Sequence, residues 1–362
     1  MALTTEEIHA LLTDATRTYG YGADLLDADD GFVEDLSAYF AGGSLTHNNR
    51  AEVHGSGQLR LLCERDWSVD RVRPYVTVTA GGITDRFDQG IWLLTRPRVR
   101  LGCTPAVYEV DVLDKVSLLA CEIGDAYVVE SGTVVVDAIQ QAITDAGYTG
   151  STPYLEGTGG STTLAADRVW VLDRTDPIRY LDVVNALLGE IGYNPIHADN
   201  AGTLTSEPET DPATQSPVWA FDLSDLDHDI VMSRELATET STDSRARYNW
   251  WRFLRIGAES PAEGNGQYTV DHSEGGHEYR ASPMEIEAAD QTTLESRGDQ
   301  IVRDDEQTLR TIPITTKPLP ILGHLDTVTY SDPQVGIVTC QVREYTQVFG
   351  RANTRATLEV LE

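Results

Sequence analysis

The stretch GSLTHNNRAEVHGSGQLRL, residues 43 to 61, decides how the chain is interpreted. His47 and His54 stand there among glycines and asparagines, just ahead of an apolar run. One interpretation makes both histidines ligands or catalytic groups. The other makes Gly42-Gly43 and Asn48-Asn49 turn residues able to adopt positive φ, and makes 58–63 a strand. No third ligand or acidic orienting group stands at a useful spacing, so the sequence favours turn and strand.

Length and composition predict a folded chain of two or three domains. A chain of 362 residues exceeds the size of one ordinary core, and its hydrophobic content of 40% supports folding. We expect no membrane span and no secretion signal, because the apolar runs are short and the N-terminus lacks a basic region. The four cysteines form no Cys-x-x-Cys pair, which favours free thiols and folding in a reducing cytoplasm.

The charge of the chain is strongly negative. A formal net charge of -31 argues against direct nucleic-acid binding, since affinity for phosphate comes from Lys and Arg. Lys115 and Lys317 are the two lysines, beside 25 arginines. Two explanations stay open: a surface adapted to high salt, or an acidic channel wall that lets DNA slide past.

Changes of pattern divide the chain into four parts. We expect a helix and an irregular arm over 1–43, and an antiparallel sheet closed or nearly closed into a small barrel over 44–122. An α/β block over 123–215 contains two predicted helices, each followed by a stop signal at Gly147 or Gly192. A second β unit covers 216–362, with an inserted loop and helix at about 258–310. The predicted fold class is mainly β with an α+β insertion.

Candidate metal ligands are few and poorly spaced. Asp227, His228 and Asp229 lie in an acidic run that is typical of a solvated surface. His272 and His277 are five residues apart and flanked by Gly-Gly, unlike the i, i+4 pair of a zinc helix. We therefore predict no metal site and no cofactor.

No motif of catalysis stands out. A phosphate loop, a dinucleotide-binding glycine pattern and a Gly-x-Ser-x-Gly elbow are all lacking in the sequence. The tryptophans occur singly or as one pair next to predicted strands, where core packing or a protein interface is the usual role. We predict no catalytic residues, and we assign Trp67, Trp250 and Trp251 to candidate interfaces.

The order of the motifs carries more information than any single residue. DLSAYFAGGSLTHNNRAEVHGSGQLRL is followed by DWSVDRVRPYVTV, FDQGIWLLTRP and YEVDVLDKVSLLA, and then by SGTVVVDAIQQAITDAGY and the second helical segment. This succession resembles tail hub proteins, also called baseplate hub or minor tail proteins, of tailed viruses. The resemblance covers most of the chain from about Asp35 onward and is weakest between Ala258 and Leu309.

The resemblance implies two small antiparallel β-barrels of the tail-tube type flanking the α/β block. It further implies a ring, usually a homotrimer, at the distal end of the tail tube, with DNA passing through the lumen and no specific nucleic-acid binding. The partners would be the tail tube or distal tail protein, the tape-measure protein, and fibre or tip proteins. The protein would be assembled in the host cytoplasm and located in the virion tail tip. In this setting His47 and His54 become polar interface contacts.

Two other functions stay open from the sequence. One is a tail-tip enzyme that degrades host envelope polymers, and the other is a receptor- or sugar-binding tip module. Convergent carboxylates or a metal in a cleft would favour the enzyme, whereas a large self-interface would favour the hub.

The salt-adaptation hypothesis predicts that the melting temperature rises between low and molar salt, because salt screens repulsion among the carboxylates. Thermal unfolding followed by circular dichroism at both salt concentrations measures this. A melting temperature that does not rise would exclude salt adaptation as the explanation of the charge.

Overall fold

A computed structural model gives the arrangement of most of the chain. It describes residues 3–68, 70–100, 105–155, 162–171, 177–222, 231–234, 248–256, 261–273, 276–286, 288–306, 311–332, 336–350 and 353–361.

The main sheet contains fourteen strands that come from both halves of the chain. The first half contributes β1 (Thr18–Leu26), β2 (Phe32–Asp35), β3 (Phe40–Asn48), β4 (Gly55–Leu61), β5 (Arg71–Ala80), β6 (Ile83–Asp88), β7 (Trp92–Arg100) and β8 (Val107–Asp114). The second half contributes β14 (Trp219–Asp222), β15 (Val231–Arg234), β20 (Thr311–Thr316), β21 (Thr327–Asp332), β22 (Gly336–Phe349) and β23 (Thr354–Leu361). The predicted mainly β fold is thereby confirmed.

The two halves of the sheet meet where β3 pairs with β22. Gly43 to Asn48 run antiparallel to Glu344 to Phe349, and the hydroxyls of Thr46 and Thr346 lie 2.9 Å apart across this pairing. One hydrophobic core extends under both halves and includes Leu45 and Trp92 from the first and Tyr345 from the second. The main sheet is therefore one structural unit.

This pairing changes the predicted architecture. The sequence predicts two separate small barrels, but strand pairing in the described residues closes neither half into a ring. The edge of β3 that faces away from β4 is occupied by β22, so the first set of strands continues into the second.

The segment expected to be an irregular arm is also corrected. Helix α1 (Thr5–Thr13) begins after the N-cap Thr4, with a capping box that includes Glu7. After it, however, β1 pairs with β5 along its whole length. Gly20 and Gly22 mark close approaches to the side chains of β5, since a Cβ at Gly22 would overlap Tyr75. The glycines that indicated irregular backbone thus permit strand packing.

The insertion comprises the elements between β8 and β14, which form a separate hydrophobic core. It contains the 3-10 helices η1 (Lys115–Leu118) and η2 (Pro212–Thr214), the helices α2 (Val135–Asp145) and α3 (Tyr180–Glu190), and the strands β9 (Tyr127–Val129), β10 (Tyr154–Leu155), β11 (Arg168–Trp170), β12 (His197–Ala198) and β13 (Leu204–Ser206). Both predicted helices are confirmed. Gly147 and Gly192 follow them with φ of 74° and 70°.

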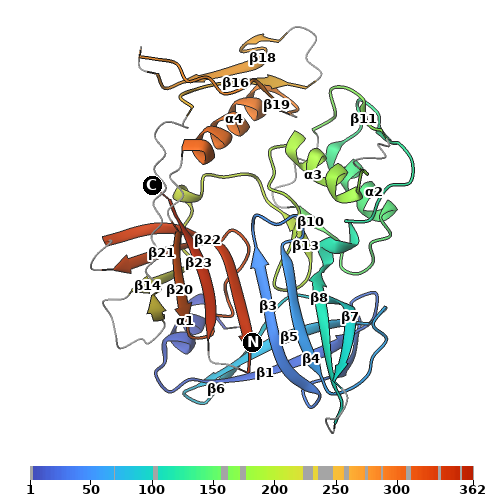
Figure 1. The fold of residues 1–362 in the computed structure, drawn as a ribbon, viewed down its shortest axis with the longest axis vertical. Coiled ribbons are helices and arrows are strands. Elements are labelled where there is room, and N and C mark those ends of the chain that lie inside the picture. The colour runs from blue at the N-terminus through green and yellow to red at the C-terminus, as the bar shows by residue number, and fades with distance from the viewer. Residues whose placement is uncertain are drawn as a thin grey trace.

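A third core belongs to a small sheet with one helix. The sheet consists of β16 (Trp250–Arg255), β17 (Ala262–Glu263), β18 (Gly266–Asp271) and β19 (Met284–Ile286), and α4 (Gln291–Glu306) packs against it. Figure 1 shows this unit at the top, the insertion at the right and the main sheet below. In the described part of the chain, no helix is long and apolar enough to cross a membrane.

We predict that Gly43→Ala destabilises the protein by roughly 1–3 kcal/mol. Gly43 has φ of 148°, and an added Cβ would overlap the Gln58 carbonyl and lie 2.9 Å from Leu59 Cα. Urea unfolding measures the loss, with Gly124→Ala as the control because nothing lies within 4 Å of a Cβ there. Equal stability of the two variants would contradict the prediction.

Candidate functional site

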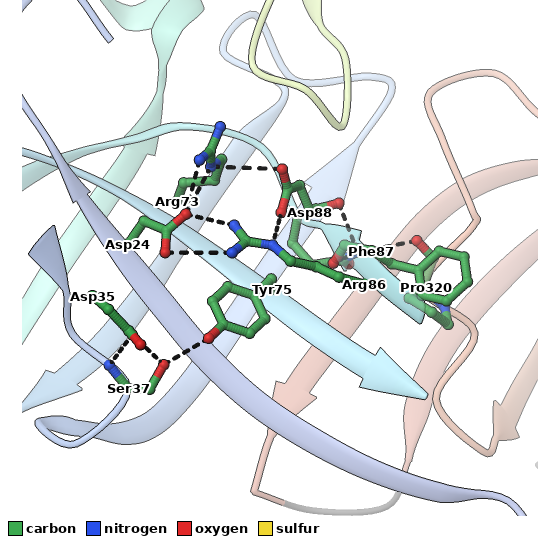
Figure 2. A network of polar contacts seen from close by, with 10 residues as sticks. Asp24, Asp35, Ser37, Arg73, Tyr75, Arg86, Phe87, Asp88 and Pro320 are labelled. Carbon is green, nitrogen blue, oxygen red and sulfur yellow. Dashed lines mark hydrogen bonds and ion pairs between the residues drawn. The ribbon is translucent and has the colours of Figure 1, made fainter. Parts of the chain in front are cut away.

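A network of charged side chains lies on β1, β5 and β6 (Figure 2). The buried carboxylate of Asp24 accepts hydrogen bonds from Arg73 Nη2 at 2.8 Å and Arg86 Nη2 at 2.6 Å. Arg86 Nε also donates to Asp88 at 2.7 Å. Burial by itself would raise the pKa of Asp24, but the hydrogen bonds and charges of the two arginines outweigh it and lower that pKa.

The same network extends to β2. The guanidinium of Arg86 lies 3.8 Å from the ring centroid of Tyr75, a cation–π contact. The Tyr75 hydroxyl is 2.7 Å from Ser37 Oγ, which in turn donates to Asp35 at 2.5 Å. Figure 2 shows these groups on one side of the strands. The network therefore fixes the end of the sheet that β1 and β2 form.

A second group of charges, which we call the Asp30 cluster, attaches the insertion to the main sheet. Asp30 accepts from Arg71 Nη1 and from Lys115 Nζ, each at 2.6 Å, and from Ser151 N at 3.0 Å. Arg71 Nη2 donates to Thr149 Oγ1 at 2.8 Å. The Lys115 side chain is fully buried. Burial opposes ionisation of Asp30, yet Lys115, the Ser151 amide and Arg71 together lower its pKa.

A third group contains four histidines, His47, His54, His197 and His324, which we call the histidine cluster. His324 lies between two of the other rings, with ring centroids 4.4 Å from His54 and 4.1 Å from His197. His47 stacks on Tyr345 at 4.6 Å and meets the edge of Trp92 at 5.3 Å. The exposed fractions of His47, His54 and His197 are 8%, 7% and 6%.

Burial keeps these rings neutral. Desolvation lowers the pKa of His47 and of His54 to about 4, with a smaller contribution from a neighbouring histidine in each case. The pKa of His324 is lowered well below its usual value for the same reason. Desolvation also lowers the pKa of His197, against the opposing charge of Glu207. His54 Nδ1 and His324 Nδ1 are buried without a hydrogen-bond partner among the described residues.

The other residues singled out in the sequence lie apart from these clusters. Trp67 is half-buried beside Tyr108, and Trp251 is fully buried with its Nε1 donating to Asp305 at 2.8 Å. Trp250 is 8% exposed and lies near the guanidinium groups of Arg252 and Arg280. All of these contacts are internal, as are those of His47 and His54. Their role in interfaces stays a prediction.

The weak metal candidates are not brought together. The rings of His272 and His277 contact Trp251 and Tyr279 respectively. Among the described residues, no group of three or more His, Cys, Asp or Glu side chains has an arrangement that could hold a metal ion. Asp227, His228 and Asp229 lie outside the described residues.

Sequence reasoning missed most members of the two clusters that join the insertion to the main sheet. His197 and His324 stand far from His47 and His54 in the sequence and belong to no motif. Lys115 carried a usable signal, because a lysine is rare in this chain and this one directly follows a strand.

Comparisons with known proteins bear on the fold. The sequence matches no protein-family model and no curated protein. The structure is similar to the tail protein from Neisseria meningitidis MC58, with a TM-score of 0.63 and 13% identity over 94% of this chain and 96% of that chain. It is similar to the 43 kDa tail protein of prophage MuSo2 from Shewanella oneidensis, with a TM-score of 0.58 and 14% identity over 94% of this chain and 98% of that chain. It is also similar to a chain of the Francisella PdpA-VgrG complex, with a TM-score of 0.53 and 9% identity. That match covers 96% of this chain and 53% of the other.

The chain therefore has the fold of phage tail proteins, and the resemblance inferred from its motifs is confirmed at the level of the fold.

We predict that Arg71→Met destabilises the protein by about 1–3 kcal/mol, because it removes one of the two cationic partners of the partly buried Asp30 carboxylate. Arg98→Met is the matched control, since the Arg98–Asp111 pair is largely exposed and its loss changes stability little. Urea unfolding of both variants at neutral pH measures the difference. Equal losses would mean that the Asp30 cluster contributes no more than a surface ion pair.

Proposed function

We propose that this protein is a structural component of a phage tail, a hub that forms a ring at the distal end of the tail tube and has no catalytic role. The observation that carries this proposal is the similarity of fold to two phage tail proteins over 94% of this chain and at least 96% of theirs. Because the similarity spans the insertion and the small sheet as well as the main sheet, it concerns the whole arrangement and not one common motif.

A ring of three copies suits the organisation of the main sheet. Each half of the sheet supplies one β unit, of eight and of six strands, so a trimer would present six β units. Six units match a sixfold tube, and closed rotational symmetry is the usual arrangement of homo-oligomers. Among the described strands β2 ends the sheet, and its exposure supports this proposal, because Phe32 and Val33 are 62% and 52% exposed.

The distribution of charge supports a channel through which DNA passes without binding. Many arginines are engaged in ion pairs with carboxylates, namely Arg50, Arg65, Arg71, Arg73, Arg86, Arg98, Arg168, Arg179 and Arg280. Paired arginines offer less positive charge to phosphate groups, and the net charge of -31 repels them. An acidic lumen would therefore not retard the duplex.

The neighbours in this proposal are other tail proteins. The ring would contact the tail tube or distal tail protein on one side and fibre or tip proteins on the other, and it would meet the end of the tape-measure protein. The protein would be located in the virion and assembled in the host cytoplasm. The similarity to a chain of a PdpA-VgrG complex supports a role in a multi-protein assembly.

We predict that native mass spectrometry of the purified protein detects a species of three copies, and that Phe32→Asp lowers its abundance at least tenfold. A carboxylate in place of the exposed Phe32 ring opposes burial against a second copy. Val128→Asp is the control, because Val128 is 55% exposed on β9 of the insertion, away from the main sheet. A protein that stays monomeric at tens of micromolar would contradict the proposed ring.

A further inference from the structure

We propose that the histidine cluster is an acid-sensitive contact between the insertion and the main sheet. Protonation of its rings would release the insertion on that side, while the Asp30 cluster keeps it attached on the other. This inference does not depend on the proposed function.

The cluster joins three parts of the chain through direct ring contacts. His197 belongs to β12 of the insertion, His54 to the turn between β3 and β4, and His324 to the loop before β21. The ring of His324 stacks on His197 and also meets His54. Nearby, Gly90 N donates to the Asn200 carbonyl at 2.8 Å, and Asn200 Nδ2 donates to the Leu322 carbonyl at 3.1 Å. The insertion is thus held on this side by stacked neutral rings, a few polar bonds and the ion pair of Arg179 with Glu52, at 2.6 Å, in the turn that carries His54.

The rest of the joint allows such a release. The core of the insertion and the core of the main sheet are separate clusters of buried side chains, so movement at the joint need not unpack either core. The second attachment, the Asp30 cluster, depends on opposite charges instead of neutral rings. Its carboxylate stays ionised in mild acid because its pKa is lowered. Mild acid therefore acts on one attachment and spares the other.

Protonated rings at this spacing repel one another in surroundings that contain little water. Ring centroids 4.1 to 4.4 Å apart place like charges close together, and repulsion at this distance is strong where the dielectric constant is low. The nearest opposite charge is Glu207, with Oε2 3.7 Å from His197 Nε2. The ion pair with Glu207 involves His197, whereas His324 has a histidine ring on either side, so separation of the rings relieves the repulsion.

Several other titratable groups face the cluster and have to be counted. Tyr345 stacks on His47 from β22, Asp114 accepts from Gly55 N beside His54, and Asp199 and Glu207 act on His197. Asp326 lies two residues after His324. Burial raises the pKa of Tyr345 further, so it stays neutral. Burial also raises the pKa of Asp114 to about 7 and that of Asp326 to about 6.

The sign of the pH dependence follows from these directions. A histidine whose folded pKa is lowered stabilises the closed joint fully above its ordinary pKa of 6.5, and that contribution is lost as the pH falls toward 4. The two carboxylic acids act in the opposite direction, because their contribution is lost as the pH rises through 6 to 7. On release, three histidine rings take up protons and two carboxylic acids lose theirs, which is a net uptake of one proton. The released population therefore rises about tenfold for each unit by which the pH falls.

Hydrogen exchange of the full chain, followed by mass spectrometry between pH 7.5 and 4.5 and corrected for intrinsic exchange, tests this proposal. We expect protection in 194–206 and 319–327 to fall about tenfold per pH unit below pH 6.5. Protection in β5 and around 149–151 should persist over the same range. Unchanged protection at the joint, or simultaneous loss over the whole chain, would overturn the proposal.

Variants separate the rings from general acid effects. His324→Phe retains an aromatic ring that does not titrate, so two rings then balance the two carboxylic acids and protection at the joint should become nearly independent of pH between about 6.5 and 4.5. His277→Phe is the matched control, an exposed ring whose aromatic contact is with Tyr279, and should behave as the natural chain. His197→Gln provides a second test if circular dichroism shows that His324→Phe does not fold. An unaltered pH dependence in a folded cluster variant would contradict the proposal.

Discussion

The pairing of β3 with β22 is the constraint on which the rest of the structure depends. It places Gly43 to Asn48 beside Glu344 to Phe349, so the two ends of the chain meet in one sheet. The segments between them that do not belong to this sheet have to leave it and return to it. The insertion leaves after β8 and returns before β14, and the small sheet with α4 lies between β15 and β20. Each of these two inserted segments has its own hydrophobic core, because the space beneath the main sheet is already filled by side chains of that sheet.

The sequence predicts local elements well and their partners poorly, for a physical reason. Apolar residues at a spacing of two or of three to four report which side of an element is buried, and this indicated β5 and the helices α2 and α3. The same spacing does not identify the neighbouring strand, so the continuous sheet was not predicted. The arm within 1–43 was predicted to be irregular, although Gly20 and Gly22 lie in a strand, because glycine in a strand and glycine in a loop look the same until the opposite side chains are known.

The candidate sites show the same limit. His47 and His54 were noticed because they stand close together between glycines, yet the rings nearest to His54 belong to His197 and His324. Gly42 and Gly43 have the predicted positive φ, of 100° and 148°, but lie inside β3 near a bulge instead of in a turn. A cluster built from distant segments leaves no spacing in the sequence. Its members are found when the fold brings them together.

The two attachments of the insertion represent two ways of burying ionisable groups. At Asp30 the charges are kept and paired, and this requires Arg71 and the buried Lys115 to accompany one carboxylate. At His54, His197 and His324 the charge is removed instead, because desolvation favours the neutral ring. The Asp30 cluster persists as long as its carboxylate is ionised, whereas the contact between the histidine rings persists as long as the pH is high enough to keep them neutral. A joint held by both kinds of contact therefore responds to acid first at the histidine rings, which makes the Asp30 cluster and the Arg179–Glu52 ion pair the contacts about which the insertion would turn.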